Sequence, residues 1–204
     1  MLQQDSHGGP GRGWIAEMNL QHVNAKMFVE GDLTIDLERF MEVFHRWVAE
    51  QSLDELLIDV ADYRHVPAGP SVVLVGHEAD YVMDNTGNRY GLLYNRKAAL
   101  DGSRSNSDRF QQALASAARV CSLLEAEFAG LKFSRSEFEL SINDRALAPN
   151  TEEASAACRT EMEEFLQAGL GASDVSIDYD RDPRRVFGGV VKLSTPLDFA
   201  ALGD

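Results

Sequence analysis

Two of the chain's five histidines lie close together in the sequence, next to acidic and aromatic residues. His65 ends the run DYRH, and His77 is followed directly by Glu78. Imidazole and carboxylate groups at short spacing can bind a transition metal or act as an acid–base pair near neutral pH. The two histidines are 12 positions apart, which fits no compact zinc motif. The chain also lacks phosphate-binding, dinucleotide-binding and serine-hydrolase motifs. We therefore expect no bound metal and no cofactor.

The pattern around His77 separates it from Glu78. Residues 72–83 predict one continuous strand, in which neighbouring side chains point to opposite faces. His77 then shares a face with apolar residues, whereas Glu78 is expected to point to solvent. The adjacent pair therefore cannot act as one catalytic unit.

A hairpin is predicted to bring three polar side chains together on the face of His77. The segment DNTGN, residues 84–88, is a strong turn signal between two strands. With residues 86–87 at the centre of the turn, His77 faces Arg96, and Tyr94 lies beside them. An imidazole, a phenol and a guanidinium next to apolar surface are typical of a binding site for an anion or a carboxylate. The loop before this strand could add further groups. The candidate ligand-binding residues are Arg64, His65, His77, Tyr94 and Arg96.

Hydrophobic periodicity predicts an α+β fold, with a mixed or mostly antiparallel sheet and three main helices. The helices are expected over residues 36–49, 107–128 and 150–169. The strands are expected over residues 25–31, 55–61, 71–83, 89–97, 131–143, 174–181 and 185–194.

The order of these elements predicts an internal duplication. A strand–helix–strand–strand pattern spans about 24–83 and recurs over about 136–194. The halves, about 21–99 and 107–195, meet at the Gly- and Ser-rich segment 100–107. We expect one α+β domain over residues 21–204, preceded by a flexible N-terminal tail over residues 1–20.

This paired arrangement resembles the vicinal oxygen chelate architecture in the order of its elements. In that family, two such modules hold a metal in a cleft between them. The resemblance implies that His22, at the start of the first strand, is a ligand, with Glu137 or Glu139 at the corresponding place in the second half.

Composition restricts the possible partners. The net charge is −14 and the pI is about 4.7, so nucleic acid is not an expected partner. No run approaches the roughly 18 apolar residues of a membrane-spanning helix, and the first residues do not resemble a secretory signal. We therefore expect a soluble, cytoplasmic protein without a membrane partner. Cys121 and Cys158 fall on apolar helix stripes and are expected to be buried.

Together these observations favour a soluble accessory or regulatory protein that binds a small anionic ligand or a protein partner without catalysis. The alternative is an enzyme, possibly metal-assisted as the resemblance implies, that uses His65 and His77 with Tyr94 and Arg96. A second alternative is a structural subunit of a homodimer.

Overall fold

The computed structural model describes residues 19–172 and 174–203. It contains three α-helices and eight strands in one sheet, so the predicted α+β class is confirmed. The α-helices are α1 (Leu37–Glu50), α2 (Asn106–Glu127) and α3 (Glu152–Glu164). Short helical turns are η1 (Thr86–Asn88), η2 (Phe165–Gly169) and η3 (Ala201–Gly203). The strands are β1 (Val23–Val29), β2 (Leu57–Asp62), β3 (Pro70–Gly76), β4 (Ala79–Asp84), β5 (Gly91–Arg96), β6 (Phe133–Ile142), β7 (Val175–Tyr179) and β8 (Phe187–Leu193).

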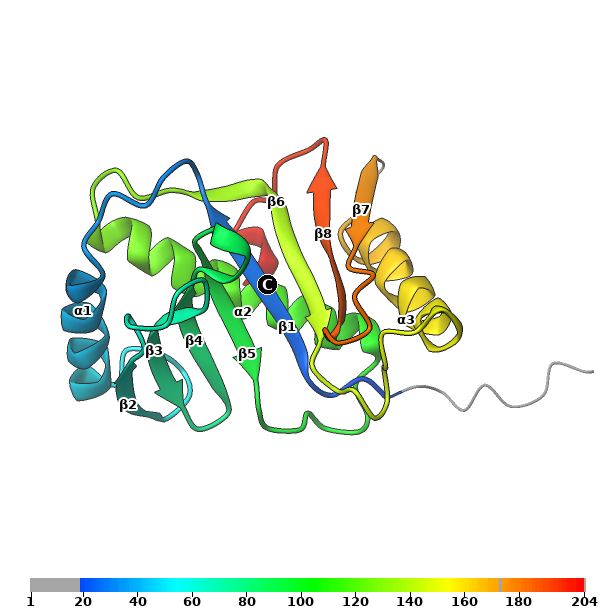
Figure 1. Cartoon of the computed structure of the whole chain (residues 1–204), viewed down its shortest axis with the longest axis horizontal. Coiled ribbons are helices and arrows are strands. Elements are labelled where there is room, and N and C mark those ends of the chain that lie inside the picture. Colours follow the sequence, from blue (N-terminus) through cyan, green and yellow to red (C-terminus); the bar gives the residue numbers. More distant parts are fainter. Residues whose placement is uncertain (1–18, 173, 204) are drawn as a thin grey trace, which may run out of the picture.

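The sheet has the order β2-β3-β4-β5-β1-β6-β8-β7 (Figure 1). Each of its pairings is antiparallel. The first strand of the chain lies in the middle of the sheet, between β5 and β6, and all seven of its residues are buried. The strands at the two edges, β2 and β7, are the ones that directly follow α1 and α3.

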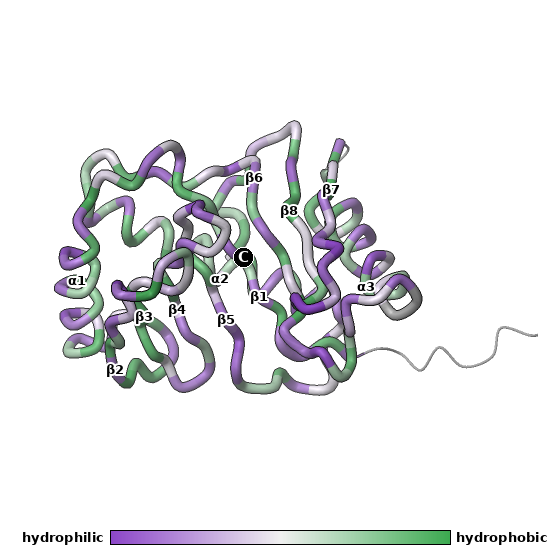
Figure 2. Tube along the Cα trace, viewed as in Figure 1, coloured by the Kyte–Doolittle hydropathy of each residue, from purple (hydrophilic) through white to green (hydrophobic). Residues whose placement is uncertain are grey.

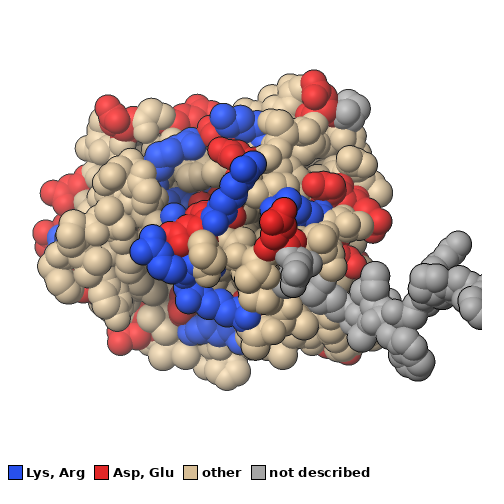
Figure 3. All heavy atoms as spheres, turned by 45° about the vertical axis from the view of Figure 1, so that its right-hand side comes forward, with Lys and Arg blue, Asp and Glu red and all other residues tan. Residues whose placement is uncertain are grey.

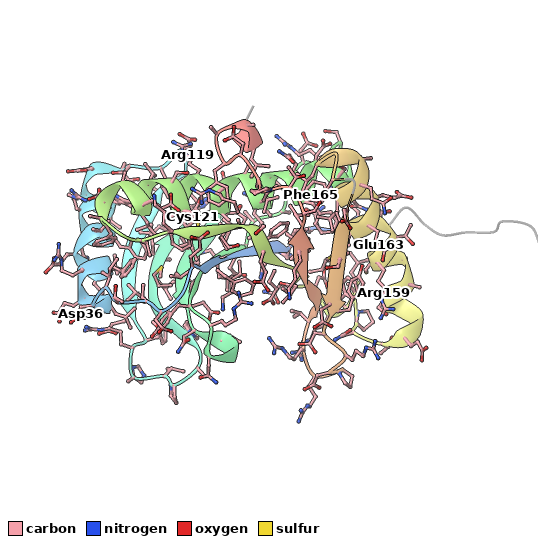
Figure 4. The ribbon with its side chains drawn as sticks, turned by 90° about the horizontal axis from the view of Figure 1, so that it is seen from above. Asp36, Arg119, Cys121, Arg159, Glu163 and Phe165 are labelled. Carbon is pink, nitrogen blue, oxygen red and sulfur yellow. The ribbon has the colours of Figure 1, made fainter. Side chains whose placement is uncertain are left out.

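One face of the sheet packs on α2, while α1 and α3 lie at its two ends (Figures 1 and 4). α2 buries one side of its length against β1 and β5, and Cys121 lies on this side. Cys158 is buried as well, so the predicted burial of both cysteines is confirmed. Asp36 caps the start of α1, because its carboxylate accepts the backbone N–H of Glu38.

The core follows from side-chain alternation along the strands. Figure 2 shows hydrophobic and hydrophilic residues mixed along the sheet. Ala25 and Met27 of β1 point toward α2 and are fully buried. Lys26 lies between them and points to the opposite face, which carries no α-helix in the part of the chain that the structure describes. On that face, the β2–β3, β4–β5 and β7–β8 connections extend away from the sheet (Figure 4).

The predicted single strand over residues 72–83 is wrong. The segment forms two strands, β3 and β4, joined by a tight turn that contains His77 and Glu78. The backbone N–H of His77 donates to the carbonyl of Leu56 at 2.8 Å, which ties this turn to the chain before β2. Both residues of the turn are exposed.

The predicted register of the β4–β5 hairpin is also wrong, by two residues. Ala79 faces Arg96 and Tyr81 faces Tyr94, because the turn is centred on Gly87 and Asn88. These two residues adopt positive φ angles of 74° and 57°. A slip of two residues keeps every side chain on its predicted face but changes its partner.

The structure does not confirm the predicted duplication. A strand–helix–strand–strand order does occur in both halves, as β1-α1-β2-β3 and as β6-α3-β7-β8. However, β6 pairs directly with β8, whereas β4 and β5 separate β1 from β3. Most of the predicted N-terminal tail, residues 1–18, lies outside the described residues. None of the helices in the described ranges has the length and apolar character needed to cross a bilayer.

Candidate functional site

Two of the five predicted ligand-binding residues, Tyr94 and Arg96, lie together beside a cavity of about 330 Å³. We call it the corner cavity, and its lining includes Glu55, Glu78, Tyr81, Tyr94, Arg96 and Arg119. It lies at the end of β4 and β5 that is next to the β3–β4 turn, under one side of α2. Alternation along β5 explains the meeting of Tyr94 and Arg96, because residues two apart in a strand share a face.

The guanidinium of Arg96 is buried, with only 7% of the side chain exposed, and its contacts hold it in place. Its Nε donates to the carbonyl of Ala98 at 2.7 Å, and Nη1 lies 3.4 Å from the hydroxyl of Tyr94. The same Nη1 donates to Oε2 of Glu78 at 2.9 Å. Burial by itself lowers the pKa of Arg96, but Tyr94 and Glu78 outweigh this effect and raise it. The cavity therefore contains a fixed positive charge.

The carboxylate partner of Arg96 is much more accessible than the arginine itself. The side chain of Glu78 is 49% exposed and projects from the tight β3–β4 turn. In the predicted continuous strand, Glu78 points to solvent on the face away from Arg96. In the structure Glu78 lies in the β3–β4 turn instead, and its carboxylate therefore reaches the Arg96 guanidinium. A half-exposed carboxylate gains little from such a pair, because water solvates it almost as well.

A second arginine in the cavity has the same kind of partner. Arg119 of α2 is half exposed and pairs with Asp54, whose side chain is 81% exposed. Gln112 lies about two turns before Arg119 on the same face of α2, and it donates to the hydroxyl of Tyr94 at 2.8 Å and to Ser116 at 3.0 Å. The corner cavity thus combines two guanidinium groups with amide and hydroxyl groups, and each guanidinium is paired with an accessible carboxylate.

Glu55 binds the backbone of the β3–β4 turn and a side chain of β4. Its Oε2 accepts the backbone N–H groups of Glu78 and Ala79 at 2.7 and 3.0 Å, and Oε1 accepts the hydroxyl of Tyr81 at 2.8 Å. Burial raises the pKa of Tyr81, and the neighbouring Glu55 carboxylate raises it further, so the phenol stays protonated as a donor. Gly76 leaves room for this carboxylate, because a Cβ at that position would overlap with it.

The other three predicted residues do not line the corner cavity. His77 is exposed on the turn, and Arg64 and His65 lie on the β2–β3 connection. The seven residues of β3 separate that connection from the turn, a length of about 20 Å at roughly 3.3 Å per residue. Arg64 pairs instead with Asp62 at 2.9 Å and, through hydrogen bonds, holds the pKa of that carboxyl at about 2. The ring of His65 stacks near Tyr63.

Sequence reasoning did not identify Glu55, Gln112 or Arg119 as parts of this site. Glu55 lies just before β2, and the other two lie on a helix that crosses several strands. The only sequence signal for Gln112 and Arg119 is a polar residue beside the apolar stripe of a helix, which is common on any amphipathic helix.

A second cavity, of about 260 Å³, lies on the helix-free face of the sheet. Phe28, Glu139, Gly188 and Val190 lie on its sheet side, and Arg89 lies at its rim. Burial raises the pKa of Glu139, and the nearby positive charges of Lys26 and Arg185 offset this only in part. Figure 3 shows basic side chains in a band across this side of the molecule, with acidic ones among them.

The residues implied by the vicinal oxygen chelate resemblance have other contacts. Nδ1 of His22 lies 3.3 Å from the carbonyl of Arg96, and Glu137 binds Arg89 through two hydrogen bonds. Within residues 19–172 and 174–203, no three histidine, cysteine or acidic side chains are grouped closely enough to hold a metal ion.

Comparison with known proteins adds no functional assignment. No protein-family model matches the chain, and no curated protein has significant sequence similarity to it.

Proposed function

We propose that this protein is a non-catalytic binding protein whose corner cavity takes a small dicarboxylate ligand. The observation that carries the proposal is the unequal burial of the Arg96–Glu78 pair, with 7% and 49% of the side chains exposed. The arginine is held by Tyr94 and Ala98, whereas the side chain of its carboxylate partner is half exposed to water. A ligand carboxylate can therefore replace Glu78 without leaving a buried charge unpaired.

The second arginine supports a ligand with two carboxylates. Arg119 lines the same cavity, and its partner Asp54 is even more exposed than Glu78. One carboxylate of the ligand would bind Arg96 and the other Arg119. Tyr94 and Gln112 would supply further hydrogen bonds, because their polar groups already face the cavity.

Titration calorimetry with succinate, acetate and succinamide tests this proposal. We expect succinate to bind more tightly than acetate, and succinamide, which lacks both charges, not to bind. Glu78→Gln removes the internal competitor, so succinate affinity should rise up to about fivefold, which corresponds to the ~1 kcal/mol upper range for such pairs.

Arg96→Gln should abolish succinate binding, whereas the matched substitution Arg39→Gln should not change it. Arg39 pairs with Glu42, and both side chains are more than 60% exposed on α1, away from the cavity. Equal binding by wild type and Arg96→Gln, or weaker binding by Glu78→Gln, would argue against the proposal.

A different observation favours the homodimer as a second candidate. Leu56, Ile58 and Tyr63 are 59%, 52% and 43% exposed, and all three lie on or next to the edge strand β2. An edge strand with exposed apolar side chains can pair with the same strand of a second copy. Light scattering at micromolar concentration tests this candidate, because Ile58→Lys should convert a dimer to a monomer.

A further inference from the structure

α2 begins in a polar turn that sequence reasoning treated only as a connection between two halves. Ser105 is the N-cap, and its hydroxyl accepts the N–H of Asp108 at 3.1 Å. The Asp108 carboxylate accepts in return the N–H of Ser105 at 2.9 Å, which completes a capping box. The 22 residues of α2 place the positive end of a long helix dipole at this turn.

A buried arginine lies one helical turn into α2. Arg109 is only 2% exposed, and its two hydrogen bonds go to the Asn106 side chain at 3.0 Å and to the carbonyl of Asp101 at 3.4 Å. Its Nε has no hydrogen-bond partner among the residues that the structure describes. Arg109 forms no ion pair with any residue in the described ranges.

This placement is electrostatically unfavourable for the protein alone. A buried guanidinium without a carboxylate loses hydration that a neutral oxygen only partly replaces. The positive end of the helix dipole adds repulsion, because cations are favoured at the opposite end of a helix. The Asp108 carboxylate offsets part of this positive charge, but it is bound to Ser105 in the capping box, so a further anion beside Arg109 would relieve what remains of both effects.

A cavity with room for a ligand adjoins this arginine. It has a volume of about 440 Å³, and Arg104, Ser105 and Arg109 line one side of it. Arg104 is exposed and also forms no ion pair within the described residues. Glu161 and Glu164 of α3 also line the cavity, and their carboxylates can accept hydrogen bonds from another part of a ligand.

We infer that this cavity binds the phosphate group of a small phosphate monoester, whose other end carries an amino or hydroxyl group. Arg109, Arg104 and the N-terminus of α2 hold the phosphate, as backbone N–H groups and arginines do at other helix N-termini. Glu161 and Glu164 hold the amino or hydroxyl group. This site is separate from the corner cavity and does not depend on the function proposed for it.

Calorimetry and 31P NMR with phosphoethanolamine, inorganic phosphate and ethanolamine test the inference at constant ionic strength set with NaCl. Phosphoethanolamine should bind saturably and more tightly than inorganic phosphate, and ethanolamine should not bind. The double variant Glu161→Gln/Glu164→Gln should bind both phosphates equally, because it removes the charges that recognise the amino group. Absence of saturable binding to both phosphates, or an unchanged preference in the double variant, would overturn the inference.

Arg109→Met and Arg104→Ala separate the two arginines. Arg109→Met should lose about tenfold or more in phosphoethanolamine affinity, as expected when charge-assisted hydrogen bonds are removed. Without phosphate, its melting temperature should equal or exceed that of wild type, because a buried charge is gone. Phosphoethanolamine should raise the melting temperature of wild type but not of Arg109→Met.

Arg104→Ala tests the same site at an exposed position and should weaken binding about threefold or more, in line with one exposed charge contact. Arg39 is an exposed arginine on α1, and Arg39→Ala should not change the affinity for phosphoethanolamine. If Arg104→Ala binds phosphoethanolamine as tightly as wild type does, the site is not the one described here, whether or not Arg109→Met folds.

Discussion

At the level of single residues, Lys26 and Asp84 form an ion pair whose side chains are only 4% and 5% exposed. Nζ of Lys26 donates to Asp84 at 2.6 Å and to the carbonyl of Thr86 at 3.2 Å, so the pair fastens the β4–β5 turn to β1. Lys26→Met should lower the free energy of unfolding by about 3–5 kcal/mol, because the buried Asp84 carboxylate loses its counter-charge and keeps only hydrogen bonds from Thr86. Urea denaturation followed by circular dichroism measures this loss.

The exposed pair Arg39–Glu42 provides the comparison for Lys26. Arg39→Met should cost at most about 1 kcal/mol, the usual value for exposed pairs. Lys26→Met/Asp84→Asn should recover part of the stability, because both charges are then removed. If Lys26→Met lowers the free energy of unfolding no more than Arg39→Met does, burial does not determine how much the Lys26–Asp84 pair contributes to stability.

Glu139 makes stability depend on pH in a defined direction. Burial raises its pKa above the ordinary value, so the folded protein holds this proton more tightly than the unfolded chain does. The favourable contribution is complete below the unfolded pKa, and it is lost as pH rises through the folded pKa. Glu139→Gln should therefore stabilise the protein relative to wild type at neutral pH. The stabilisation should be smaller near pH 4, because the Glu139 carboxyl of the wild-type protein is itself largely protonated there.

Urea denaturation at several pH values measures this difference, with Asp174→Asn as the control. Asp174 is an exposed carboxylate just before β7, so its substitution should shift stability little at any pH. A stability difference between Glu139→Gln and wild type that does not grow from acidic to neutral pH would contradict the assignment.

At the level of elements, the β3–β4 hairpin depends on a residue outside it. Glu55 accepts two N–H groups of the turn and the hydroxyl of Tyr81. Glu55→Ala should lower the free energy of unfolding by about 1–3 kcal/mol, because three donors lose their acceptor. Hydrogen exchange at Glu78 and Ala79 should also become faster.

The neighbouring Asp54→Ala serves as the control for Glu55. The Asp54 side chain is 81% exposed and pairs with the half-exposed Arg119, so its loss should change stability by less than about 0.5 kcal/mol. Equal protection of the turn amides in Glu55→Ala and wild type would mean that the local sequence, and not Glu55, fixes the hairpin.

The same hairpin shows where prediction from sequence reaches its limit. Helices and most strands follow from apolar periodicity, and so does the shared face of Tyr94 and Arg96. The His77-Glu78 turn lacks the usual Asn-Gly or Asp-Gly signal, and its acceptor Glu55 lies 23 positions before Glu78. Local patterns cannot reveal a turn that a distant side chain stabilises.

The candidate sites also depend on contacts between distant residues, which local sequence patterns do not reveal. The predicted hairpin indicates Arg96 because strand alternation places it on the same face as Tyr94, whereas Arg119 and Gln112 come from a helix that crosses that strand. Arg109 falls on the predicted second helix, but its burial without a carboxylate depends on how α2 and α3 pack. Residues that act together across different elements require the tertiary structure.

At the level of the whole molecule, the excess of acidic residues should govern the response to salt. The chain has 33 acidic and 19 basic side chains, for a net charge of −14. Many of the basic groups are paired, as in Arg46–Glu127 and Lys97–Asp80, so repulsion among the remaining carboxylates opposes folding. Raising NaCl from about 0.01 M to about 0.1 M shortens the Debye length from roughly 30 Å to roughly 10 Å, which screens this repulsion.

The melting temperature at pH 7 should therefore rise with NaCl over this range. Near the pI of about 4.7, many carboxylates are protonated and the net charge approaches zero, so the same increase in salt should have little effect or lower the melting temperature. Differential scanning calorimetry at both pH values makes the comparison. A melting temperature that falls with NaCl at pH 7 would mean that solvent-accessible ion pairs such as Arg46–Glu127, which salt also screens, contribute more to stability than the acidic excess removes.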